Sequence, residues 1–292
     1  MARKIDWIIG FALAGGALAV MGIIGLVVIA ALVGDESDFS YATGDRIGVV
    51  EINGVISDAD EVVAQIVGYR EDSSIPAIVL RINSPGGVVA PTQEIYEALN
   101  LARQAGKTII ASMGSVAASG GYYVACAADT IMANPGTLTG SIGVIFEVPN
   151  ASGLYDKIGI DWQVIKSGVH KDIGSSARKM TTEERGHMQA VVDDTFEQFV
   201  NVVVNSRPLT RSEVLEVADG RVFTGNQAKG LGLVDRLGTY QDALILAADM
   251  SGMTGTPNVV KPKKKSIFDL MVENMESVFQ APTSVFLEYR LR

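Results

Sequence analysis

Three short stretches of this chain carry residues whose types and spacing could perform nucleophilic catalysis. The first is AASGGYY, which contains Ser119 and directly follows an apolar run typical of a buried strand. A serine at a strand-to-helix turn lies where helix N–H groups point toward incoming negative charge, and the N–H of Gly120 could serve as an oxyanion donor. The position favours Ser119 as a nucleophile, although it also suits a serine that only caps a helix.

The second stretch is NSPGG, which ends at Gly86 and Gly87 and again follows a buried strand. Glycine allows the chain to turn sharply and allows a ligand to come close to the backbone N–H groups. Donors held in this way can stabilise the negative charge of a tetrahedral intermediate. The alternative is a tight strand-to-helix turn that takes no part in chemistry.

The third stretch is KSGVHKD, in which Lys171 precedes a predicted helix. A serine hydroxyl is a poor nucleophile until a base takes its proton. Histidine usually does this, but the chain has only His170 and His187, and His187 falls within an amphipathic helix. A lysine can act as the base when burial lowers the pKa of its ammonium group. The alternative for Lys171 is an ordinary solvated lysine on a loop.

Strands and helices alternate around these stretches, which indicates an α/β architecture. Apolar runs predict strands over residues 47–56, 75–83, 108–113, 130–133 and 138–144, and helical spacing predicts a helix over 91–103. Residues 114–128 combine a glycine pair with a small-residue helix. Thr181 and Glu184 have the spacing of a capping box and predict the start of a long helix.

Composition excludes several classes of function. The net charge of −9 argues against nucleic acid as a partner, because phosphate binding needs clustered Lys and Arg. The single cysteine, Cys126, excludes an internal disulfide framework and a cysteine-rich zinc site. It lies in the apolar sequence YYVACAA and is expected to be a buried structural residue. The predicted chemistry needs no metal or other cofactor.

The N-terminal region predicts a membrane anchor. The 27 residues at 7–33 carry no charge, which is enough for a bilayer-spanning helix of about 20 residues and exceeds the apolar part of a cleaved signal peptide. Arg3 and Lys4 precede this span, and acidic residues follow it. The positive-inside rule therefore places residues 1–6 in the cytoplasm and the catalytic domain on the other side of the cell membrane.

The remaining chain divides into a linker at 34–45, a catalytic domain at 46–250 and a tail at 251–292. The tail combines Lys261 and Lys263–Lys265 with an amphipathic helix predicted over residues 267–279. This tail could dock on its own core or on a neighbouring subunit, lie on anionic lipid, or occupy the substrate groove as a C-terminal peptide. The first of these is the preferred interpretation.

Taken together, the motifs resemble the signal peptide peptidase A family of membrane-anchored Ser/Lys proteases. The resemblance covers about residues 47–239. It is carried by five motifs in the family's order, namely RINSPGG (81–87), MGSVAASGGYYVA (113–125), TGSIGV (139–144), SGVHKD (167–172) and GRVFTGNQAKGLGLVDRLG (220–238).

The resemblance implies a role for each matching position. Ser119 matches the nucleophile and Lys171 the general base, while Ser141 matches a serine that orients the lysine. Gly86 or Gly87, together with the N–H of Gly120, matches the oxyanion hole. The resemblance therefore implies a serine endopeptidase with a Ser/Lys dyad and no cofactor.

The resemblance also implies a fold and partners. The fold is that of the caseinolytic protease and crotonase superfamily, built from repeated ββα units. Such proteins form homo-oligomers in which catalytic residues of adjacent subunits meet in shared sites. The implied substrates are remnant signal peptides and other short or unfolded hydrophobic segments at the membrane surface.

The same fold could also serve two other functions. A crotonase-type acyl-CoA enzyme also uses paired N–H donors, but it normally adds carboxylates rather than a serine and a lysine. A non-catalytic membrane scaffold would have no need for both Ser119 and Lys171. Turnover of crotonyl-CoA, or failure of Ser119 to react with a fluorophosphonate, would distinguish these alternatives.

Overall fold

The computed structural model of the 292-residue chain describes residue 21 and residues 45–254, 258–261 and 288–290. The chain divides into two units, Met1–Thr43 and Gly44–Arg292, and the second contains the sheet and every predicted site residue. Residue 21 apart, the predicted membrane span lies outside the described residues, as does the predicted tail helix. In the described ranges, no helix has the length and apolar character needed to cross a bilayer.

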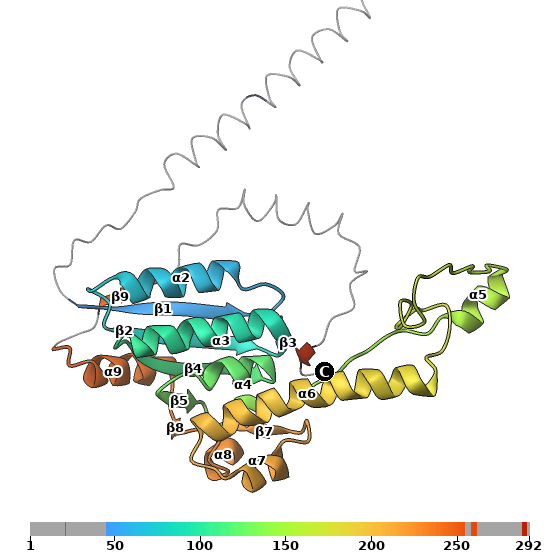
Figure 1. Ribbon diagram of the computed structural model, residues 1–292. Coiled ribbons are helices and arrows are strands. Elements are labelled where there is room, and N and C mark those ends of the chain that lie inside the picture. The colour runs from blue at the N-terminus through green and yellow to red at the C-terminus, as the bar shows by residue number, and fades with distance from the viewer. Residues whose placement is uncertain (1–20, 22–44, 255–257, 262–287, 291–292) are drawn as a thin grey trace, which may run out of the picture. The chain divides into compact units, whose positions relative to one another are not determined.

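An eight-stranded sheet forms the centre of the second unit (Figure 1). Its main path is β7-β6-β4-β2-β1-β9, and β5 and β8 extend it from β4. Only the β6–β7 pair is antiparallel among the described pairs of this sheet. The strands are β1 (Arg46–Asn53), β2 (Ala77–Ser84), β4 (Thr108–Ala118), β5 (Thr130–Ala133), β6 (Leu138–Gly140), β7 (Val222–Thr224), β8 (Arg236–Leu237) and β9 (Asn258–Val260).

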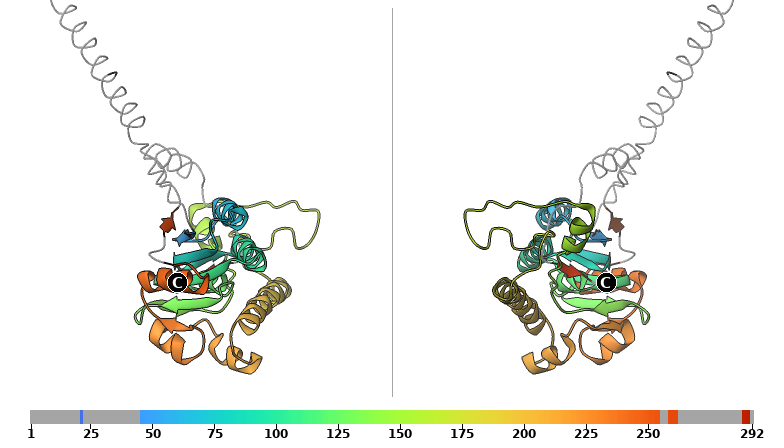
Figure 2. Two further views of the ribbon diagram at one scale, coloured as in Figure 1. Left: turned by 90° about the vertical axis from the view of Figure 1, so that its left-hand side faces the viewer. Right: turned by 90° about the vertical axis from the view of Figure 1, so that its right-hand side faces the viewer.

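Helices cover both faces of this sheet, as the views in Figure 2 show. Val49, Val79 and Ile110 pack in one cluster with residues of α9, while alternate residues of the same strands pack in a second cluster with α2, α3 and α4. The helices are α2 (Asp60–Glu71), α3 (Val89–Gln104), α4 (Gly120–Ala125), α5 (Ser152–Ile158), α6 (Thr182–Ser206), α7 (Arg211–Val217), α8 (Gly225–Gly230) and α9 (Tyr240–Met250). Coverage on both faces explains why the central strands read as continuous apolar runs.

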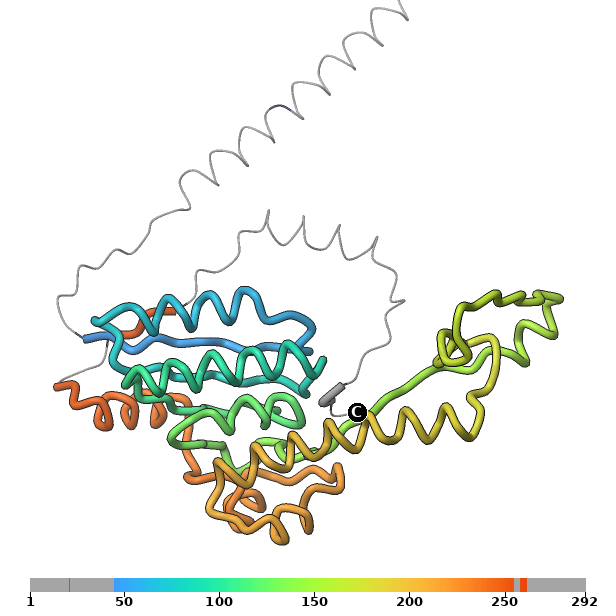
Figure 3. The backbone as a smooth tube through the Cα atoms, viewed as in Figure 1, coloured from blue at the N-terminus to red at the C-terminus, as the bar shows by residue number. Residues whose placement is uncertain are grey.

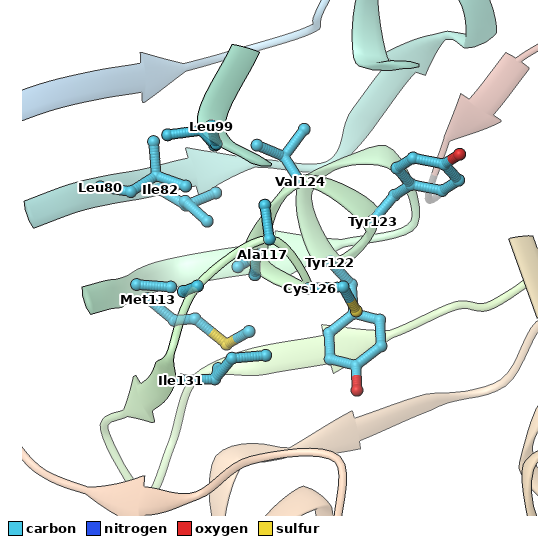
Figure 4. Packing of buried hydrophobic residues seen from close by; sticks show 14 of the residues in the cluster. Leu80, Ile82, Leu99, Met113, Ala117, Tyr122, Tyr123, Val124, Cys126 and Ile131 are labelled. Atoms are coloured by element: carbon cyan, nitrogen blue, oxygen red, sulfur yellow. The ribbon is translucent and has the colours of Figure 1, made fainter. Parts of the chain in front are cut away.

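The short helix α4 is embedded in the larger of these clusters. Every residue of α4 is buried, and Figure 4 shows Tyr122 and Val124 among side chains of β2, α3 and β5. The Tyr122 hydroxyl donates a 2.9 Å hydrogen bond to the carbonyl oxygen of Leu233. Cys126, which follows α4, is buried as predicted, and burial raises the pKa of its thiol. This packing holds the turn before α4 firmly in place.

The strands and helices differ from the sequence expectations at several ends. Strand β4 continues past Met113 to Ala118, because Val116–Ala118 pair with β6, and the small-residue helix starts only at Gly120. Strand β6 ends at Gly140 rather than at residue 144, because the next residue, Ser141, has a positive φ. The sequence did not predict α2 or α5. The capping box of Thr181 and Glu184 is present at the start of α6, as predicted.

The segment between β6 and α6 leaves the sheet. Residues 145–181, here called the arm, carry α5 and extend away from the strands alongside the first half of α6 (Figure 3). The apolar face predicted for α6 divides accordingly. Phe199 and Val203 are buried against the core, whereas Met188 and Val192 are only half-buried.

Candidate active site

Ser119 lies between the end of β4 and the first turn of α4 in a conformation that L residues rarely adopt, with φ 54° and ψ −117°. Such backbone strain costs about 1–3 kcal/mol and persists only where the surroundings impose it. The Ser119 N–H donates to the carbonyl oxygen of Gly140 at 2.8 Å, and its carbonyl accepts from the N–H of Tyr123 at 2.9 Å. Its side chain makes no capping hydrogen bond to α4, so the alternative of a capping serine finds no support.

Ser141 lies directly beside this turn. Ala118 of β4 pairs with Gly140 of the parallel strand β6, and Ser119 and Ser141 are the residues that directly follow the two strands. Ser141 has φ 51°, and Ser119 and Ser141 alone among the described non-glycine residues have a positive φ. Both are buried. The carboxyl ends of parallel strands are where α/β proteins commonly bind ligands, so the pair occupies a position suited to a site.

The glycine pair after β2 forms the short strand β3 (Gly86–Val88). A Cβ on Gly87 would lie 2.0 Å from the carbonyl oxygen of Ile56, so no other residue fits without moving the backbone. The Ile56 N–H donates to the Gly86 carbonyl at 3.0 Å, and the Val88 N–H donates to the Ile56 carbonyl at 2.7 Å. The Gly86 N–H donates to the hydroxyl of Ser84 at 3.1 Å.

The start of α4 packs against β3 and the end of β2. A Cβ on Gly121 would lie 2.8 Å from the carbonyl oxygen of Ser84, which shows how closely the two backbones approach. This approach, with the contact between α4 and β3, brings Gly120 to the glycines of β3. The structure therefore gathers Ser119, Ser141 and all three predicted oxyanion glycines at one edge of the sheet.

The C-terminal region supplies a strand at this edge. Residues of β10 (Glu288–Arg290) pair antiparallel with β3, with Tyr289 opposite Gly87 and Arg290 opposite Gly86 (Figure 1). Strand β10 also lies against α4. Residues 288–290 of the tail therefore lie on the chain's own core, whereas the amphipathic helix predicted over 267–279 lies outside the described residues.

Lys171 does not join this group within the chain. It lies on the arm, is exposed, and belongs to a turn in which its own N–H donates to the Gly168 carbonyl at 3.1 Å. No hydrogen bond connects Lys171 to Ser119 among the described residues. A cavity of about 330 Å³ between the arm and α6 includes neither residue. The single chain thus brings together every predicted site residue except the base.

An ion-pair cluster beside Lys171 was not predicted from the sequence. Arg178 binds both Asp172 and Glu184, and Lys166 also binds Asp172. In the sequence, Asp172 belongs to the SGVHKD motif and Glu184 to the predicted capping box. Arg178 lies six positions from each partner and follows no periodic pattern, so the sequence carried no signal that these side chains meet.

Metal-ligating side chains do not cluster within the described ranges, where no group of three or more His, Cys, Asp or Glu residues could hold an ion. The backbone N–H groups of the predicted oxyanion glycines are of the kind that can stabilise negative charge. The arrangement suits acyl transfer by a serine, provided that a base reaches it.

Two family models match the chain. The model described as peptidase family S49 matches residues 101–254, and the Clp protease model matches residues 42–137. Together the matches cover every strand of the sheet except β9, the turn of Ser119 and the arm. The Clp match agrees with the predicted caseinolytic protease-like fold.

Curated relatives include proteins named as proteases. A protease of Synechocystis sp. is 45% identical over 216 residues, covering 74% of this chain and 78% of the relative. Signal peptide peptidase SppA of Enterococcus faecium is 37% identical over 216 residues, covering 70% of this chain and 63% of the relative. Protease 4 of Salmonella typhi is 34% identical over 248 residues, but the match spans only 40% of that protein. These matches support the peptidase interpretation over an acyl-CoA enzyme.

Proposed function

The chain belongs to peptidase family S49 and is a serine peptidase, and from that premise we propose that Ser119 is its nucleophile and Lys171 its general base. The observation that carries the first assignment is the strained turn of Ser119, which has positive φ at the end of a buried strand and lies beside Ser141 and the glycines of β3. Strain of this kind is typical of functional residues.

The proposed reaction proceeds through an acyl-enzyme. Lys171 takes the proton of the Ser119 hydroxyl while Oγ of Ser119 attacks the carbonyl carbon of the scissile peptide bond. The N–H groups of Gly120 and Gly87 hold the developing oxyanion. Gly87 is the better donor in β3, because the Gly86 N–H already binds Ser84. The lysine then gives its proton to the leaving amine and activates the water that releases the acyl group, and Ser141 orients the lysine.

The base comes from a second copy of the chain. Lys171 is exposed on the arm, and a lysine base needs burial that the described part of this chain does not supply. The arm also exposes apolar side chains, including Trp162, Ile165 and Val169. An exposed apolar surface of this kind marks a contact surface. Docking of the arm on a neighbouring subunit would bury these side chains and bring Lys171 to the neighbour's Ser119.

The substrates are extended peptides that add a strand to β3. The pairing of β10 with β3 supports this proposal, because it demonstrates that the edge of β3 accepts an antiparallel strand next to Ser119. The substrate class we propose is remnant signal peptides and other short or unfolded hydrophobic segments. A membrane anchor at residues 7–33, with the catalytic domain on the extracytoplasmic side, would hold the site where such segments emerge.

Mixing two inactive variants tests the proposed dyad and the shared site together. Ser119→Ala and Lys171→Ala should each abolish cleavage of a fluorogenic peptide by the purified full-length protein. When the two variants are co-assembled, about a quarter of the sites should combine an intact serine with an intact lysine, so activity should return.

Each outcome of this experiment has a distinct meaning. Activity in either single variant would overturn the assignment of that residue. Inactive single variants that give no activity after co-assembly would overturn the shared site and place both residues in one chain. Wild-type activity should also rise with pH, as expected when the base must lose a proton.

A further inference from the structure

The guanidinium group of Arg178 makes the shortest ion-pair contacts between the loop that carries Lys171 and helix α6 among the described residues. We propose that Arg178 is a positioning residue for the base, because it links the carboxylate of Asp172, the neighbour of Lys171, to the carboxylate of Glu184 in the first turn of α6. This inference rests on the proposed role of Lys171 and adds a residue on which that role depends.

Arg178 uses all three of its side-chain nitrogens in this link. Its Nε donates to Oδ2 of Asp172 at 2.9 Å and its Nη2 to Oδ1 at 2.7 Å. Toward Glu184, Nη1 donates to Oε2 at 2.7 Å and Nη2 to Oε1 at 2.5 Å. Two bidentate contacts made by one planar group fix both carboxylates in distance and in orientation.

The two carboxylates are shielded from water. The side chains of Asp172 and Glu184 are 12% and 5% exposed, against 48% for Glu197 in the ion pair with Arg211 that links α6 to α7. Hydrogen bonds from Arg178 lower the pKa of Glu184 to about 2 and hold the pKa of Asp172 well below its usual range. Both groups therefore stay charged at neutral pH, and without Arg178 they would repel each other.

Each end of the link is anchored to backbone. Glu184 is the capping-box residue of α6, and its Oε2 accepts from the N–H of Thr181 at 2.8 Å. Asp172 directly follows Lys171, and its carbonyl accepts from the N–H of Ser175 at 3.1 Å. The link thereby fixes the Lys171 backbone relative to α6. The second half of this long helix is packed in the core.

Other contacts between this loop and α6 are weaker. His170 lies 3.7 Å from Glu183 and stacks on His187, but its side chain is 48% exposed and that of Glu183 is 82% exposed. Exposed pairs of this kind contribute little to holding a loop. Lys166 binds Asp172 from within the arm itself and so does not connect the loop to the helix.

Loss of Arg178 should therefore change catalysis more than substrate binding. A displacement of about 1 Å in a catalytic group can cost about 100-fold in rate. The substrate edge at β3 does not include Arg178, so KM should stay close to the wild-type value. Arg178→Ala should lower kcat about 100-fold, and Arg178→Lys, which keeps the charge but loses the fork, should lower it at least tenfold.

The test uses full-length protein in detergent micelles and a fluorogenic peptide. Arg211→Ala serves as the matched control, because it removes an exposed ion pair with Glu197 without touching the arm. Methylguanidinium in the buffer should restore part of the kcat of Arg178→Ala, and it should have no such effect on the control or on Lys171→Ala. Size-exclusion chromatography establishes which variants keep the wild-type assembly.

The outcomes separate this inference from the proposed function. If Lys171→Ala is inactive but Arg178→Ala and Arg178→Lys keep kcat within twofold of wild type, the positioning role is overturned while the dyad stands. If Lys171→Ala is active, the dyad itself is wrong. If Arg178→Ala does not assemble, Arg178→Lys in intact assemblies decides, and a kcat within twofold of wild type overturns the role.

Discussion

Replacement of Gly87 by alanine tests whether the close approach of β3 to Ile56 sets the geometry of the site. The added Cβ would lie 2.0 Å from the carbonyl oxygen of Ile56 and 2.6 Å from its nitrogen. Ordinary contact begins near 3.4 Å, so the two backbones must separate by about 1.4 Å. Because both partners are backbone, no side-chain rotation can relieve the contact.

Two measurable effects should result from this separation. Overpacking of this kind costs about 1–3 kcal/mol, and each kcal/mol lowers the thermal midpoint of a domain of this size by about 2–4 °C. Alanine keeps the N–H of residue 87. Any loss of activity would therefore result from displacement of this N–H and not from its removal. A displacement above 1 Å should lower kcat/KM for peptide cleavage by about 100-fold or more.

Gly68→Ala provides the matched control. Gly68 lies on the exposed side of α2 with no atom near its would-be Cβ, so the same substitution should stabilise the helix by about 0.5–1 kcal/mol and leave activity unchanged. Differential scanning fluorimetry and peptide kinetics should be recorded for both variants below their midpoints. If Gly87→Ala keeps kcat/KM within threefold of wild type, the argument from backbone proximity is refuted.

Three further predictions concern the tail, the arm and the core. Deletion of residues 288–292 should raise kcat/KM for an added peptide severalfold, because β10 then no longer competes for β3, and an unchanged or lower value would contradict this. The lowered pKa of Glu184, about 2 against 4.5, means that its stabilising effect is complete above about pH 4.5 and is lost as the pH falls toward 2. The free energy of unfolding, measured by circular dichroism, should therefore change less with pH in that window for Glu184→Gln than for wild type. Tyr122→Phe removes the donor to the buried Leu233 carbonyl and should cost about 1–2 kcal/mol in urea unfolding, whereas a cost near zero would show that the bond contributes nothing.

Much of the local structure could be predicted because it depends on neighbours in the sequence. The apolar run before NSPGG predicted a buried strand, and β2 lies there with both faces covered. The spacing of Thr181 and Glu184 predicted the start of α6. The sequence analysis did not predict α2, although Val62, Ile66 and Tyr69 stand at the i, i+4, i+7 spacing of an apolar helix face and pack in the core.

The grouping of the site residues depended on pairing between distant strands. Only the register that places Ala118 opposite Gly140 makes Ser119 and Ser141 neighbours, and only the approach of Gly121 to Ser84 brings Gly120 to β3. The motifs had predicted these residues as site residues through their resemblance to a known family. Their positive φ values and close contacts result from tertiary packing, which a sequence pattern does not encode.

Hydrophobic periodicity by itself determined the α/β class, because it depends on spacing along the chain. Residue types favoured Ser119 as the nucleophile, and the resemblance of five motifs to a known family indicated the peptidase family. The tertiary structure decided which groups meet. It brought the turn of Ser119 close to the glycines of β3 and paired β10 with β3. It placed Lys171 on the arm, away from Ser119 and these glycines. Contacts between residues far apart in sequence depend on how strands pair and helices pack, so they emerge only when the whole chain has folded.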